Sequence, residues 1–132
     1  MELLKTYPTE LLILGFLIVT FLQSGIDKIV DWKGNVSFIK VHFANSPLKN
    51  SVPLLVAIIL ITEIIAGIFM MIGAYELISS GDKIYALIGT ELAALALIFL
   101  LIGQRLAKDY AGAMTLAVYF VTTIFGVYLL SH

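Results

Sequence analysis

The fold is decided by the stretch SVPLLVAIILITEIIAGIFMMIGAYELI at residues 51–78. It opens with Pro53 at a position that the first turn of a helix tolerates, and it ends before the polar break SSGD at residues 79–82. A helix needs about 20 apolar residues to cross the hydrocarbon core of a bilayer. Residues 51–78 therefore predict a transmembrane helix.

Three further apolar stretches of similar length cover residues 10–30, 83–104 and 110–130. The chain is 61% hydrophobic and 13% charged, a composition that a water-soluble domain does not carry without large exposed apolar patches. The last two stretches are separated only by the polar hinge QRLAKDY, so they should form a tight antiparallel hairpin. We therefore expect an all-α integral membrane protein, with residues 1–132 forming one antiparallel bundle of four transmembrane helices.

The segment DWKGNVSFIKVHFANSPLKN, residues 31–50, joins the first two predicted spans. It mixes apolar side chains with lysines and asparagines, which favours an interfacial segment or a short amphipathic helix. The alternative is a lid over a cavity.

Lysine and arginine are distributed unevenly between the two ends of the predicted bundle. The end that carries residues 31–50 and the 104–110 hinge holds Lys28, Lys33, Lys40, Lys49, Arg105 and Lys108. The opposite end holds Lys5 and Lys83. Positive side chains are enriched on the cytoplasmic side, so both termini are expected outside the cytoplasm.

Two acidic residues fall inside the predicted spans, where a charged group costs about 2.5 to 3.5 kcal/mol on insertion scales. Glu63 follows Ser51 by roughly 18 Å of helix, and Glu91 precedes Arg105 by roughly 21 Å, so both should lie near the midplane. If they face one another, at least one should be protonated, and the pair can relay a proton or bind a ligand. The alternative is that each donates a hydrogen bond to a neighbouring helix and fixes the register of the bundle.

Polar residues also follow one another at helical spacing near the end of the first span. Thr20, Gln23, Ser24 and Asp27 stand at i, i+3, i+4 and i+7, so we expect this stripe to face the bundle. Lys28 follows directly and can pair with Asp31 or with Asp109. These pairings make a structural clamp.

A second group of candidates lies at the same end of the bundle and on the last span. An anion or headgroup pocket formed by Lys28, Arg105 and Lys108 is the functional alternative to the clamp. Tyr119 lies near the middle of residues 110–130, where its hydroxyl suits a carboxyl group or a quinone carbonyl, although a packing role is the simpler interpretation.

Several chemistries find no support in the sequence. Cysteine is absent, which removes thiol redox chemistry and thiolate metal ligands. The histidines are His42 and His132, both outside the spans, so no haem or metal is expected to bind this chain alone, and His42 is expected to be an ordinary surface residue. The net charge is −1, without a basic run, so nucleic acid is not an expected partner.

Two segments resemble a known family. FLIVTFLQSGIDKIVDWKG, residues 16–34, is similar to the first-helix pattern of DoxX-type proteins, in which an apolar run leads into a polar residue, glycine and lysine. LLVAIILITEIIAGIFMMIGA, residues 54–74, resembles the second helix of that family, where a glutamate is followed by two glycines. The positions that match are Gly25, Lys28, Glu63, Gly67 and Gly73.

The resemblance implies a four-helix protein of the bacterial inner membrane, with periplasmic termini in the orientation given above. It also implies a relation to subunits of thiosulfate:quinone oxidoreductase. The first functional hypothesis is therefore a non-catalytic subunit of a membrane oxidoreductase or other envelope complex, with Glu63 and its neighbours contacting a partner helix, a quinone or a lipid.

Two alternatives remain open at this point. The chain can be a small carrier or proton-coupled transporter, a homo-oligomer whose Glu63 and Glu91 line a midplane cavity. It can also be a small enzyme that acts on a lipid or a quinone.

Overall fold

The computed structural model describes residues 6–47 and 50–132, and within these ranges the chain forms five helices. They are α2 (Pro8–Val30), α3 (Trp32–His42), α4 (Val52–Ser79), α5 (Ile84–Leu106) and α6 (Tyr110–Leu130). In the described residues, all of these except α3 are long and apolar enough to cross a membrane, so the chain is a multi-pass membrane protein. The bounds of the four long helices differ from the predicted spans by at most two residues.

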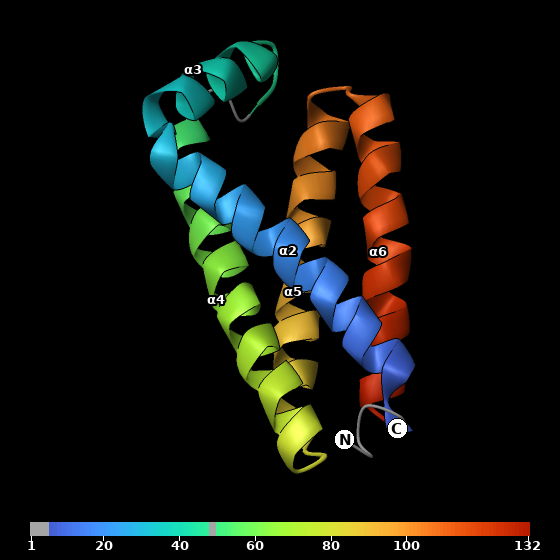
Figure 1. The fold of residues 1–132 in the computed structure, drawn as a ribbon. Helices are drawn as coiled ribbons and strands as arrows, with labels where there is room; N and C mark the ends of the chain where they lie inside the picture. Colours follow the sequence, from blue (N-terminus) through green and yellow to red (C-terminus); the bar gives the residue numbers. More distant parts are fainter. Residues whose placement is uncertain (1–5, 48–49) are drawn as a thin grey trace.

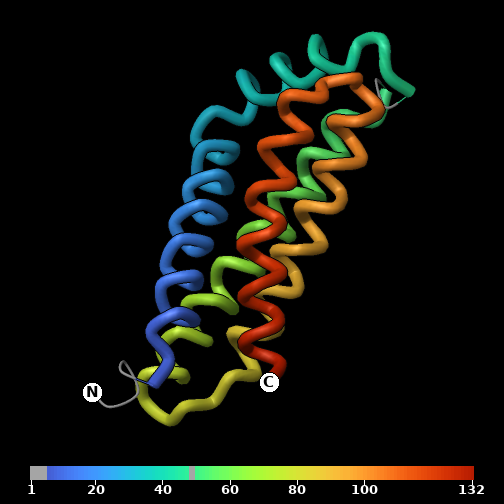
Figure 2. Tube along the Cα trace, turned by 90° about the vertical axis from the view of Figure 1, so that its right-hand side faces the viewer, coloured from blue at the N-terminus to red at the C-terminus, as the bar shows by residue number. Residues whose placement is uncertain are grey.

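The long helices pack side by side, and α3 lies across one end of them (Figures 1 and 2). α5 packs between α4 and α6, while α2 crosses the other helices obliquely and packs mainly on α4 (Figure 1). The C-terminus lies at the end opposite to α3 (Figure 1). This arrangement leaves one side of α5 open to the surroundings.

Aspartates begin two of the helices. The Asp31 carboxylate accepts a hydrogen bond from the Gly34 amide at 3.3 Å, and the Asp109 carboxylate accepts one from the Gly112 amide at 2.9 Å. Such caps satisfy an amide that has no partner inside the helix. They fix the sharp changes of direction from α2 into α3 and from α5 into α6.

Small residues allow α4 and α5 to approach closely. A methyl group on Gly73 would meet the backbone of Ala86, and one on Gly89 would lie 2.7 Å from the amide nitrogen of Met70. Ala93 and Ala96 continue the buried face of α5. In lipid, close packing of this kind replaces the hydrophobic effect as the attraction between helices.

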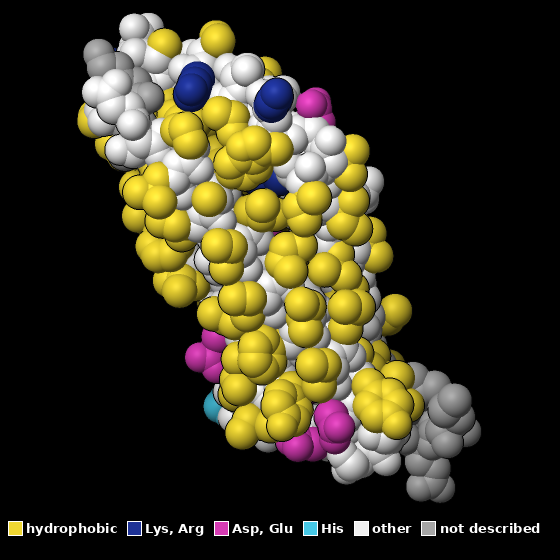
Figure 3. Space-filling model, turned by 90° about the vertical axis from the view of Figure 1, so that its left-hand side faces the viewer, with side chains coloured by type: hydrophobic (Ala, Val, Ile, Leu, Met, Phe, Trp, Pro, Cys, Tyr) yellow, Lys and Arg dark blue, Asp and Glu magenta, His cyan; other side chains and the backbone are white. Residues whose placement is uncertain are grey.

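The outer surface of the long helices is apolar. Large apolar side chains are exposed along each of them, and Figure 3 shows hydrophobic side chains covering most of one flank. The lysine and arginine side chains in that view lie toward the α3 end. Acyl chains of lipids are the natural surroundings for such a surface.

Replacing Gly73 with alanine should destabilise the protein, because the added methyl group would clash with the backbone of Ala86, and α5 would have to move away from α4 to make room. We expect a loss of about 1 to 3 kcal/mol, measured by thermal or denaturant unfolding in detergent. Gly15→Ala is the matched control, since a Cβ at Gly15 has no neighbour within 4 Å. Equal stability of Gly73→Ala and Gly15→Ala would contradict the close approach of α4 and α5.

Candidate functional site

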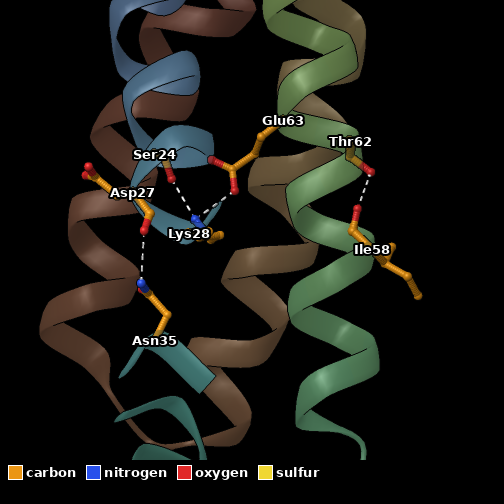
Figure 4. Close-up of polar contacts among 7 residues, drawn as sticks. All are labelled: Ser24, Asp27, Lys28, Asn35, Ile58, Thr62 and Glu63. Carbon is orange, nitrogen blue, oxygen red and sulfur yellow. Dashed lines mark hydrogen bonds and ion pairs between the residues drawn. The ribbon is translucent and has the colours of Figure 1, made fainter. Parts of the chain in front are cut away.

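An ion pair joins α2 to α4 inside the bundle. Lys28 Nζ lies 2.9 Å from Glu63 Oε1 and donates a hydrogen bond of 2.6 Å to Ser24 Oγ (Figure 4). The Glu63 side chain is 3% exposed and that of Lys28 is 17% exposed. Because Glu63 is so deeply buried, its charge depends on the ammonium group of Lys28.

The backbone direction of the two helices explains why these side chains meet. α2 ends and α4 begins at the α3 end of the molecule (Figure 1). Side chains lean toward the N-terminus of their helix, so Lys28 leans into the bundle and Glu63 leans toward the α3 end. Eleven residues, or about 16 Å of helix, separate Val52 from Glu63, a distance that the long lysine stem helps to bridge.

The carboxylate of Glu63 is not fully satisfied. The ammonium group of Lys28 approaches Oε1 at ion-pair distance, but its direction does not give hydrogen-bond geometry, and Oε1 has no other hydrogen-bond partner among the described residues. A buried acceptor without a hydrogen bond costs about 1 to 3 kcal/mol. Glu63 does not line the cavity described below, so its partner in the structure is the ammonium group of Lys28.

A cavity of about 500 Å³ opens beside this pair, between α3, α4 and α5. Its polar lining residues among those described are Lys28, His42, Gln104 and Asp109. The rest of the wall is apolar or glycine, with side chains that include Phe38, Ile39, Phe43, Val56, Ile59 and Leu100. An apolar chamber with a few convergent polar groups is the usual form of a small-molecule site.

α3 covers the cavity and is fastened to the turn between α5 and α6. His42 Nε2 lies 3.0 Å from Gln104 Oε1 and 3.3 Å from Asp109 Oδ2. The other oxygen of Asp109 caps α6, so one carboxylate connects both elements. His42, expected to be an ordinary surface residue, is 27% exposed and has partners more than sixty positions away, which no local pattern in the sequence indicates.

The polar stripe predicted on α2 faces the bundle only in part. Gln23 and Asp27 are exposed, and the Asp27 carboxyl points away from Glu63 (Figure 4). α2 instead turns Gly25 toward α4, where a Cβ would meet the Ile64 side chain at 2.5 Å. Lys28 lies on that same face, which explains why it pairs with Glu63 rather than with Asp31 or Asp109.

Glu91 does not meet Glu63. The buried face of α5 contains Gly89, Thr90 and Ala93, and Glu91 projects from the opposite side, where it is exposed. The two acidic residues therefore share no cavity, and the pair that the sequence suggested is not formed.

The remaining candidates lie outside the cavity. Tyr119 is half-buried, with its ring 6.1 Å from that of Phe16. Arg105 and Lys108 are exposed, and the Arg105 guanidinium lies 5.4 Å from the Tyr110 ring centre. Of the three cations of the predicted anion pocket, Lys28 is the one that lines the cavity.

No protein-family model matches the chain, and no curated protein and no solved structure is similar enough to count as a relative. Within the described residues, no three His, Asp or Glu side chains gather in a way that suits a metal ion. The assignment of function accordingly rests on the cavity and on the contacts around it.

Replacing Lys28 with methionine should destabilise the protein by about 3 kcal/mol, because the buried carboxylate of Glu63 then has no counter-ion. The double variant Lys28→Met/Glu63→Leu should recover to within about 1 kcal/mol of the native protein, since neither charge remains buried. Unfolding in detergent measures both values, with exposed Lys40→Met as the control. Additive losses in the double variant would show that the two side chains do not interact.

Proposed function

We propose that the cavity under α3 binds a membrane-soluble amphipathic molecule of the quinone type, with its head near Lys28 and its tail against the apolar wall. The observation that carries this proposal is a cavity of about 500 Å³ that is apolar except for Lys28, His42, Gln104 and Asp109. A water-soluble metabolite would make few favourable contacts with such an apolar wall.

The polar groups of the cavity suit a head that accepts hydrogen bonds. An ammonium group has three N–H donors; Ser24 accepts one from Lys28 and Glu63 lies at ion-pair distance, so one donor remains for a carbonyl oxygen in the cavity. The Gln104 side-chain nitrogen provides further donors from α5, because the Oε1 atom of this residue is the atom that faces His42. A quinone presents carbonyl oxygens of this kind at the end of an apolar chain.

The position of the opening suits a ligand that arrives from the lipid. Ile58 of α4 and Phe99 and Ile102 of α5 line the cavity and are also exposed on the outer surface. A molecule dissolved in the bilayer therefore reaches the cavity by passing between α4 and α5, without crossing water.

The placement of the chain in the membrane is part of the proposal. We place it in the bacterial inner membrane as an antiparallel bundle, with α3 at the cytoplasmic interface and both termini in the periplasm. The excess of lysine and arginine at the α3 end supports this orientation. Phe38 and Val41 on α3 are 69% and 78% exposed, and we expect their side chains to insert into the headgroup region.

The resemblance to DoxX-type proteins extends the proposal to a role as a non-catalytic subunit of a membrane oxidoreductase. Lys28, Glu63 and Gly25, which carry part of that resemblance, are the residues that join α2 to α4 beside the cavity. A subunit of this kind would hold quinone for a partner that performs the electron transfer. Purification from the native membrane in mild detergent, followed by mass spectrometry, should then identify a stoichiometric redox partner.

Gly103→Leu tests the cavity directly. A Cβ at Gly103 would meet only the Phe43 ring, at 3.5 Å, so a leucine there fills the cavity without striking the backbone. We expect at least tenfold weaker binding of a short-chain benzoquinone, measured by quenching of Trp32, the one tryptophan of the chain. Gly15→Leu, which projects into open space, should bind as the native protein does.

The double variant Lys28→Met/Glu63→Leu tests the contact between Lys28 and the head of the ligand separately from the contact between its tail and the apolar wall. Loss of a charged hydrogen-bond donor should weaken quinone binding by about tenfold. Affinity that stays the same in both the Gly103→Leu protein and this double variant would refute the proposed site. Binding of a fatty acid with loss of quinone binding would point to an anionic lipid instead.

A further inference from the structure

Glu91 is an acidic residue on the lipid-facing side of a membrane-spanning helix. It follows Ile84, the first residue of α5, by about 10 Å of helix, and its side chain is exposed. Among the described residues it makes no hydrogen bond and no ion pair, in contrast to Glu63. Ionisable residues within spans face the interior of an assembly, so an exposed one indicates that the assembly is larger than this chain.

The residues around Glu91 form a regular line along α5. Steps of four, three, four and three residues connect exposed positions on the open side of the helix, and we name them the α5 seam: Ile84, Ile88, Glu91, Leu95 and Ile98. This alternation is the spacing with which one helix packs along another, with a single polar residue that sets the register. The seam ends before Ile102, which lines the cavity.

The orientation in which copies of the chain insert into the membrane determines which residues of a second copy would contact the α5 seam. Two copies that insert in the same orientation are related by a two-fold axis along the membrane normal. Their α5 helices then run parallel, and Glu91 of one copy meets Glu91 of the other. Two carboxyl groups that share one proton form a strong hydrogen bond, and the single negative charge that they keep lies between the two helices rather than against lipid.

The described cations near the spans do not offer a better partner. Lys28 is held by Ser24 and Glu63, and Lys83 lies over the Tyr7 ring at the end of the molecule opposite to α3. We propose that the protein forms a parallel homodimer through the α5 seam, with Glu91 hydrogen-bonded to its counterpart. This proposal is independent of the ligand in the cavity.

Cysteine cross-linking in native membranes tests the interface, because the chain has no cysteine of its own. Ile88→Cys and Leu95→Cys, which lie on the α5 seam, should give a covalent dimer on mild oxidation. Val118→Cys and Val121→Cys are the controls, since these α6 side chains are 64% and 69% exposed on another part of the surface. Equal cross-linking at all four positions, or seam cysteines that link only to a different protein, would overturn the homodimer.

Substitution of Glu91 tests the hydrogen bond itself. In lipid vesicles, Glu91→Leu should lower the dimer association constant by about 5- to 30-fold, measured by energy transfer between labelled copies. Glu91→Gln keeps a donor and an acceptor and should stay within about threefold of the native protein. Dimerisation of Glu91→Leu at the native level would overturn the role of the carboxyl group, because this variant removes a polar group from lipid and should fold normally.

Discussion

The structure depends on one constraint, which is that a carboxylate lies deep inside a helix suited to span a bilayer. Glu63 is 3% exposed, and Lys28 of α2 supplies its counter-ion at 2.9 Å. A desolvated charge of this kind requires a partner, so the Lys28 contact determines how α2 is rotated and how it crosses α4. The glycines on either side of this contact, Gly25 and Gly67, allow the helix backbones to come close enough for the pair to form.

The cavity follows from the same geometry. Lys28 reaches inward from near the end of α2, which ends at Val30, and α3 lies across the end of the molecule beside it. His42 then fastens α3 to Gln104 and Asp109, so the space between α3, α4 and α5 is roofed rather than open. The ammonium group of Lys28 and the imidazole of His42 are polar groups in the otherwise apolar lining of this cavity.

The sequence was sufficient for the helices and insufficient for their rotations. Long apolar runs and the polar breaks between them placed the ends of α2, α4, α5 and α6 within two residues, since length and hydropathy determine a span. Rotation is harder because the lipid-facing side and the packed side of α5 are both mainly apolar, so no amphipathic stripe shows that Glu91 faces outward while Ala93 and Ala96 are buried. The polar stripe that ends at Asp27 was expected to face the bundle for its helical spacing alone. In the structure the packing of Gly25 against Ile64 determines which side of α2 faces α4.

Native mass spectrometry of the protein, released from its own membrane in mild detergent, is the most direct test of whether the cavity under α3 binds a ligand. We predict that one quinone or similar amphipathic molecule remains bound per chain, and that it is lost when Gly103 is enlarged to leucine. Protein that carries no such molecule, or that keeps the same molecule in the Gly103→Leu variant, would contradict the assignment of the cavity as a binding site.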